Sequence, residues 1–287
     1  MQYAIVISLL VVTQLFAAEF KKEGGDYVYR DTLRFEESAL DLSKLDCEAV
    51  NGEIQLTGED RNTVSVTAFV RIEAEDLKDG QAYLKGFKPV VERDGATLKV
   101  YTVHPDSKIS WDDLNANIDF VIVAPKQLNL EASCANGEIT AVGMTGGADL
   151  SSANGEISFV SLDGVHSSID ASCANGEITI DVAKLHGDSK FSTANGEISI
   201  TVHKTLAGNI SASTANGAIE LALPENSSMK VSASTLVNGS ISSDWSGNRE
   251  ESLIGDEYEL VVNEGQYLVE CSSVNGEISI RKANQAN

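Results

Sequence analysis

The sequence has 287 residues, of which 42% are hydrophobic and 6% aromatic, and its 43 Asp and Glu outnumber 21 Lys and Arg to give a formal charge of −22. The hydrophobic fraction is sufficient for a sizeable core, so the chain is not a disordered acidic tail. The negative charge argues against a nucleic-acid partner, because binding to phosphates requires a basic surface that releases counterions. It argues equally against docking on an anionic membrane surface.

The N-terminal segment 1–18 is predicted to be a signal peptide. It has no charged residue, and an apolar run at 4–12 precedes Ala17 and Ala18, after either of which we expect cleavage. An uncleaved membrane anchor is the alternative, but the run is short for crossing about 30 Å of hydrocarbon. We therefore expect an extracytoplasmic protein, periplasmic, secreted or at the cell surface, with no transmembrane segment after cleavage.

Four further regions are expected along the chain. Residues 19–33 are predicted to be an extended lead-in, and 34–125 to form N-terminal coils interrupted by a helix at 73–85. Gly80 makes this helix marginal. Regular repeats are expected at 126–281 and a polar tail at 282–287.

An eightfold repeat of Asn-Gly dominates the sequence. Each Asn-Gly is followed, two residues after the Gly, by Ile, and the five separations between Asn136 and Asn238 are 18, 21, 20, 21 and 22 residues. The outer gaps of 85 and 37 residues are close to four and two times the same period. The asparagines are Asn51, Asn136, Asn154, Asn175, Asn195, Asn216, Asn238 and Asn275, and the isoleucines are Ile54, Ile139, Ile157, Ile178, Ile198, Ile219, Ile241 and Ile278.

Side chains around each Asn-Gly alternate between apolar and polar, which predicts strands with one buried face. The dipeptide itself fits either a two-residue hairpin turn or a corner between strands of a coil. We favour the coil, because short units that cannot bury their own apolar face are stabilised by stacking. The expected fold is an all-β, single-stranded parallel β-solenoid with coils of about 20 residues and one short helix in the N-terminal third.

Stacking of such coils would place equivalent residues in columns. We expect the isoleucines to form a continuous aliphatic stack and the asparagine side chains to form a ladder or to pair with corner backbone groups. The predicted ladder residues are Asn136, Asn154, Asn175, Asn195 and Asn216, with Ile139, Ile157, Ile178, Ile198 and Ile219.

The same motifs carry a family resemblance. A predicted signal peptide, the strand sequence Val-Ala-Pro-Lys-Gln-Leu-Asn-Leu at 123–130 and repeated Asn-Gly-Glu-Ile units resemble the bacterial putative-adhesin family of β-strand repeats, a domain of unknown function. The resemblance covers roughly 42–280 and implies a β-solenoid in the cell envelope. It offers no catalytic residues to transfer.

The four cysteines are not expected to form intrachain disulfides. Cys134 and Cys173 share one repeat position on either side of a rung that has Ser152 there, so they should lie about 9.6 Å apart, beyond the reach of a disulfide. Cys47 and Cys271 belong to opposite ends of the coil. We expect the thiols to behave as small core residues.

A column of carboxylates is the sharpest candidate site. Glu follows Gly in six repeats, and four of these glutamates fall in consecutive rungs, where neighbours would lie about 5 Å apart. Such a stripe could bind calcium or a basic partner, whereas side chains that splay apart in screened solution would serve solubility alone. The calcium candidates are Glu138, Glu156, Glu177 and Glu197.

No phosphate loop, nucleophile elbow or zinc motif occurs in the sequence, so we predict no catalytic residues and no cofactor other than the calcium candidate. The favoured function is a non-enzymatic cell-envelope protein, adhesin-like or scaffolding, that presents an acidic repetitive surface to an envelope or extracellular protein or a glycan. The alternative is an envelope-sensing or regulatory accessory protein that binds a periplasmic partner. A polysaccharide-acting β-helix enzyme is less favoured, because aromatic and basic residues are scarce.

Overall fold

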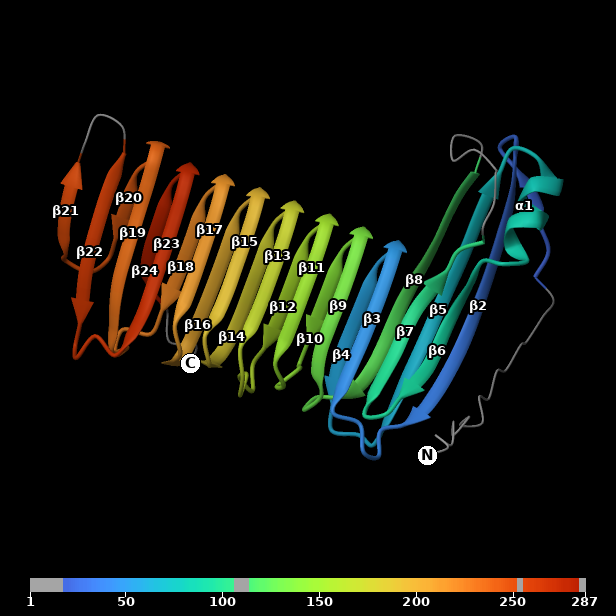
Figure 1. Ribbon diagram of the computed structural model, residues 1–287, viewed down its shortest axis with the longest axis horizontal. Coiled ribbons are helices and arrows are strands. Elements are labelled where there is room, and N and C mark those ends of the chain that lie inside the picture. Colours follow the sequence, from blue (N-terminus) through green and yellow to red (C-terminus); the bar gives the residue numbers. More distant parts are fainter. Residues whose placement is uncertain (1–17, 106–113, 252–254, 284–287) are drawn as a thin grey trace, which may run out of the picture.

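A computed structural model describes residues 18–105, 114–251 and 255–283. These residues form two twelve-stranded β-sheets that share one continuous hydrophobic core, with a single helix at one end (Figure 1). The expected signal peptide lies outside the described residues except for Ala18. The fold is all-β, mostly parallel and solenoid-like.

Sheet 1 holds the strands that follow the Asn-Gly corners. In spatial order its members are β1 (Lys21–Glu23), β2 (Asp26–Ser38), β5 (Thr63–Ala74), β8 (Leu114–Pro125), β4 (Ile54–Glu59), β10 (Ile139–Val142), β12 (Ile157–Ser161), β14 (Ile178–His186), β16 (Ile198–Ala207), β18 (Ile219–Leu223), β24 (Ile278–Lys282) and β20 (Ile241–Ser243).

Sheet 2 holds the strands that end at the corner asparagines. Its spatial order is β21 (Asn248–Glu251), β22 (Asp256–Val262), β19 (Met229–Asn238), β23 (Tyr267–Asn275), β17 (Ile210–Asn216), β15 (Ser189–Asn195), β13 (Ile169–Asn175), β11 (Ala148–Asn154), β9 (Asn129–Asn136), β3 (Lys44–Asn51), β7 (Thr97–Val103) and β6 (Lys88–Asp94).

We call a rung one strand of sheet 2, its Asn-Gly corner and the strand of sheet 1 that follows. Because each corner carries the chain from one sheet to the other, the two strands that flank it do not pair as a hairpin. They pair in parallel with the equivalent strands of adjacent rungs, so that Ile157 lies between Ile139 and Ile178. The side chains of this isoleucine column are at most 1% exposed.

The order of the rungs differs from the order of the sequence at the C-terminal end. The rung of Asn275 lies between those of Asn216 and Asn238, since β23 pairs with β17 on one side and β19 on the other. Spacing along the chain therefore did not reveal this order. The reason is physical: every rung presents similar edges, so the C-terminal segment pairs equally well inside the stack.

The large gap after Asn51 is also filled differently from a run of further coils. The rungs of Asn51 and Asn136 are direct neighbours. The intervening residues instead build the end of the stack, where β1, β2, β5 and β8 pair in antiparallel fashion and β6 pairs antiparallel with β7. The expected parallel N-terminal coils are therefore wrong here, because antiparallel strands have the same period-two alternation as parallel ones.

The ends of the stack carry the other departures from expectation. The expected lead-in at 19–33 forms β1 and the first part of β2, and β21 and β22 form an antiparallel cap beyond β19. The expected helix is present as α1 (Leu77–Leu84), which begins after an N-cap at Asp76 whose side chain accepts a hydrogen bond from the Lys78 N–H. Gly80 is required there, because a Cβ would lie 2.7 Å from the Phe20 ring.

Candidate functional site

The Asn-Gly corners form a continuous ladder of side-chain hydrogen bonds. In each rung the Asn Nδ2 donates to the Asn Oδ1 of the preceding rung in the stack, over 2.9 to 3.1 Å from Asn51 through Asn275. The last bond, from Asn238 to Asn275, is 3.4 Å long. The structure thus brings all the predicted ladder asparagines together in one line.

Glycine is required at these corners because the backbones of neighbouring rungs approach closely. A Cβ on Gly155 would lie 2.0 Å from the Gly137 carbonyl oxygen, inside any allowed contact. The close approach lets each corner Gly N–H donate to the Asn carbonyl of the next rung, as Gly155 does to Asn175 over 3.1 Å. The corner therefore satisfies its backbone groups between rungs rather than with solvent.

A second ladder lies two residues before each corner asparagine, and the sequence interpretation missed it. The side chain at this position donates to the Gly carbonyl of the preceding rung over 3.1 to 3.3 Å. Thiols and hydroxyls serve this purpose interchangeably, which is visible in the sequence only as a recurrence of Cys, Ser and Thr. The donors are Cys134, Ser152, Cys173, Thr193, Thr214 and Ser273.

All four cysteines are free and buried. Cys47 and Cys271 lie deeper than the other two, and burial raises the pKa of the Cys271 thiol to about 12. Burial also raises the pKa of Cys47 far above its ordinary value. Neither thiol can therefore ionise to a reactive thiolate at neutral pH.

The four calcium candidates occupy equivalent positions in four successive rungs. Their backbone carbonyls accept hydrogen bonds from the isoleucine N–H groups, as Glu156 does from Ile139 over 2.9 Å. The side chains point to solvent except for that of Glu197, whose pKa is raised by partial burial and by the charges of Glu220 and Glu177. In residues 18–105, 114–251 and 255–283, no three His, Cys, Asp or Glu side chains are arranged to hold a metal ion. The geometry thus lends no support to a calcium site.

The outer face of sheet 2 carries two further columns that sequence reasoning did not single out. One consists of serines three residues before each corner asparagine, paired rung by rung across the sheet. In stack order these serines are Ser133, Ser151, Ser172, Ser192, Ser213, Ser272 and Ser234. A shallow groove of about 670 Å³ runs over the first three and the neighbouring alanines.

The second column is acidic and lies two residues before the serines. Asp46, Glu131, Asp149 and Asp170 are partners in adjacent strands of sheet 2. Lys44 forms an ion pair with Glu131. The pKa of Asp149 is raised by its partial burial and by the charges of Glu131 and Asp170. The face therefore combines closely spaced carboxylates with a line of hydroxyls.

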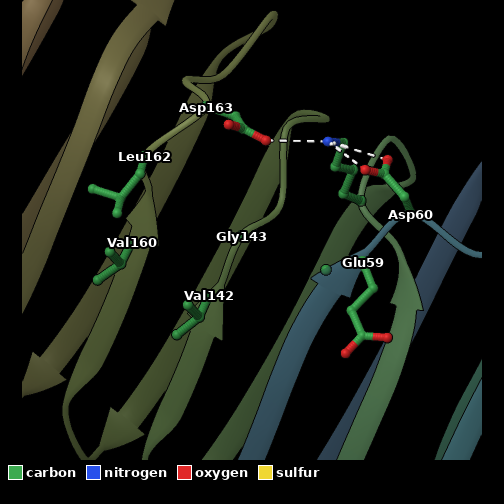
Figure 2. A pocket seen from close by; sticks show the side chains of 9 residues that line it. Glu59, Asp60, Val142, Gly143, Val160, Leu162 and Asp163 are labelled. Carbon is green, nitrogen blue, oxygen red and sulfur yellow. Dashed lines mark hydrogen bonds and ion pairs between the residues drawn. The ribbon is translucent and has the colours of Figure 1, made fainter.

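A compact notch opens where the chain leaves sheet 1, at the corner opposite the Asn-Gly ladder. β10 has four residues, whereas the neighbouring β4 and β12 have six and five, so the shortest repeat leaves a recess between two longer rungs. The recess has a volume of about 310 Å³, and its apolar lining includes Val142, Val160 and Leu162 (Figure 2). Leu162 is 73% exposed.

Lys126 spans the rim of this notch. Its Nζ lies 3.1 Å from a carboxylate oxygen of Asp60 and 3.1 Å from one of Asp163, which come from opposite sides of the recess (Figure 2). Hydrogen bonds to Asp163 and Asp60 raise the pKa of the Lys126 ammonium. The amine is therefore held protonated as a bridge and does not serve as a nucleophile.

The histidines do not form a metal site. The rings of His166 and His186 have centroids 6.1 Å apart, and His203 Nε2 lies 2.6 Å from Asp181 Oδ1. Neither pair belongs to a larger ligand set in the part of the chain that the structure describes. These side chains supply at most two donors each, fewer than zinc requires.

Comparisons with known proteins identify the fold. A model of the Toastrack DUF4097 family matches residues 37–281. No curated protein matches the chain. Among the described residues, no helix combines the length and apolar character needed to cross a membrane.

Three solved structures are similar to this chain. A "putative cell adhesion protein" from Clostridium sporogenes has 10% identity and a TM-score of 0.33, covering 88% of this chain and 99% of its own. A "putative adhesin" from Bacteroides fragilis has 11% identity and a TM-score of 0.40, covering 87% and 97%. A "putative lipid binding protein" from Parabacteroides distasonis has 14% identity and a TM-score of 0.33, covering 89% and 97%.

Proposed function

The chain belongs to the Toastrack DUF4097 family, and we propose that it is a non-enzymatic, exported cell-envelope protein that binds its partner through the outer face of sheet 2. The proposed role is adhesin-like or scaffolding. Its repeating unit is a turn of about 20 residues, and each added turn extends the same surface.

The observation that carries this proposal is the pair of columns on sheet 2. Seven serines form one line and four carboxylates form another, at the spacing of adjacent strands, about 4.8 Å. Such a face presents the same groups at every level, which suits a partner that is itself extended or repetitive. A surface of this kind differs from a catalytic centre, which needs a few unlike groups converging on one point.

The acidic column favours a basic partner. Two of its carboxylates, Asp149 and Asp170, have no lysine or arginine in an ion pair among the described residues, and the whole chain carries a formal charge of −22. Complementary charge would speed association and orient the partner on this face. A glycan partner would instead use the serine hydroxyls and carboxylates as hydrogen-bond groups.

Two double variants test the proposal. Ser172→Arg with Ser192→Arg places bulky cations on neighbouring strands of sheet 2, whereas Thr179→Arg with Ser199→Arg makes the same change of charge on the same two rungs of sheet 1. Binding would be measured to an immobilised lysine-rich peptide and to a glycan array. We expect the sheet 2 variant alone to lose at least about tenfold in affinity, equivalent to about 1.4 kcal/mol.

Equal losses in the two variants would show that net charge rather than the sheet 2 face governs binding, and would contradict the proposal. Absence of binding to both probes, or cleavage of an arrayed glycan, would contradict it as well. Export has its own test: the protein recovered from the envelope or medium should lack its first 17 or 18 residues by mass spectrometry.

The notch favours the alternative function, an accessory protein that recognises one defined periplasmic partner. It occurs at one level of the stack and combines an apolar floor with an ionic rim, which suits a single side chain or segment of a partner. Leu162→Asp would test this function by co-purification from envelope extracts. Loss of one specific protein, with binding to the sheet 2 probes unchanged, would favour the accessory function over the adhesin-like one.

A further inference from the structure

The terminal corner of the stack, Asn238-Gly239, is built differently from the seven other Asn-Gly corners. In those seven, the Gly N–H donates to the Asn carbonyl of the next rung over 2.8 to 3.2 Å. In the spatial order of the rungs Asn238 is last, so Gly239 has no rung beyond it. Among the described residues the Gly239 N–H has no hydrogen-bond partner, and both residues are exposed.

The side chain of Asn238 is also held less firmly than the others. Within the stack, Asn175 donates to Asn154 over 3.0 Å and accepts from Asn195 over 2.9 Å. Asn238 makes only the 3.4 Å bond to Asn275, and its Oδ1 accepts no hydrogen bond from the described residues.

The strand that leads to this corner is irregular. The register of β19 against β23 shifts between Thr235 and Asn238, so the terminal rung contains an extra residue. Leu236 and Val237 in this bulge are 63% and 47% exposed. The bulge removes the terminal corner from the tight register that fixes the others.

Asn-Gly is chemically labile because the small glycine leaves its own nitrogen free to approach the preceding side chain. The glycine nitrogen, on losing its proton, attacks the Asn Cγ, and the C–N bond to the side-chain amide breaks to release ammonia. Water then opens the resulting five-membered imide at one of its two carbonyls, which yields aspartate or isoaspartate. Bonding the glycine N–H and fixing the amide side chain both prevent this attack, so each must be undone by local opening.

We propose that Asn238 is a modification site that undergoes spontaneous deamidation in the folded protein, while the ladder protects the other seven Asn-Gly corners. The product carries a negative charge and can no longer donate from Nδ2 to Asn275. Isoaspartate also lengthens the backbone by one methylene at the corner. The modification therefore loosens the terminal rung and the cap formed by β21 and β22.

The test uses the eight corners of one molecule as their own controls. The full-length chain would be incubated at mildly alkaline pH, digested, and followed at each Asn-Gly by peptide mass spectrometry, with electron-transfer fragmentation to separate isoaspartate from aspartate. We expect Asn238 to react at least about tenfold faster than any other corner, since each of those must first open a bonded glycine N–H.

The same chain unfolded in guanidinium supplies the reference rate, because its eight dipeptides are then equally accessible and should react within a few-fold of one another. A folded-state rate at any inner corner that equals or exceeds the rate at Asn238 would overturn the proposal. So would a folded-state rate at Asn238 well below its unfolded rate. As a second check, Asn238→Gln should abolish most ammonia release from the folded protein, while release after unfolding falls only by about one site in eight.

Discussion

The buried hydroxyl of Thr193 offers a sharp test of the ladder that lies two residues before each corner asparagine. Thr193→Val keeps the shape of the side chain but deletes the oxygen that donates to the Gly176 carbonyl over 3.2 Å. Thr193 is 6% exposed, so a replacement donor from solvent has little access. Leaving a buried acceptor without its partner costs about 1–3 kcal/mol, and we expect the free energy of unfolding to fall by that amount.

The assay is urea denaturation followed by far-ultraviolet circular dichroism, with the matched variant Thr179→Val as control. Thr179 is exposed on the outer face of sheet 1, where the same change should alter stability by less than about 0.5 kcal/mol. Cys173→Ser should be nearly neutral, because Ser152 already fills this position one rung away. If Thr193→Val is as stable as the wild type, or if both valine variants lose the same amount, the ladder does not stabilise the fold as argued.

Three further predictions follow from the core and the charges. Ile178→Ala should lower the free energy of unfolding by about 2–5 kcal/mol in a denaturant titration, because the side chain is fully buried and leaves a cavity; a loss below about 1 kcal/mol would contradict the stacked column. Cys47 and Cys271 should resist alkylation in the native protein at neutral pH, whereas four thiols should react after unfolding without reductant, and two or fewer would reveal a disulfide. Asp149→Asn should stabilise the protein at neutral pH, because the raised pKa means that the folded state binds the proton more tightly than the unfolded state. Stability conferred by protonation is lost as pH rises above about 4, so the advantage of Asn should vanish below that pH in thermal melts; a pH-independent difference would assign it to another cause.

The local structure of the corners could be predicted from the sequence because it depends on near neighbours. Period-two alternation on both sides of Asn-Gly indicates strands with one buried face, and the dipeptide indicates a corner. An aliphatic column and an asparagine line follow once equivalent positions are stacked. The helix near Gly80 was predictable for the same reason, although its N-cap at Asp76 fixed its first residue more narrowly than the apolar pattern did.

The candidate surfaces needed contacts between distant residues. The notch depends on a short rung between two longer ones, and the separation of 18 residues hinted at it. The Lys126 bridge, however, joins Asp60 to Asp163, and nothing in the spacing pairs those carboxylates. The role of Cys173 as a donor to Gly155 was equally hidden, since a buried thiol in a sequence suggests packing alone.

The sequence by itself determined a repeated unit, its strands, its corners and the residues that face the core, because those properties depend on alternation and on the chemistry of one dipeptide. Only the tertiary structure decided which rungs are neighbours. It placed Asn275 between Asn216 and Asn238, and it built one end of the stack from antiparallel strands after Asn51. The physical reason is that a strand edge offers the same backbone groups to any partner, so the choice among partners depends on where the whole chain can close its core and cover its ends.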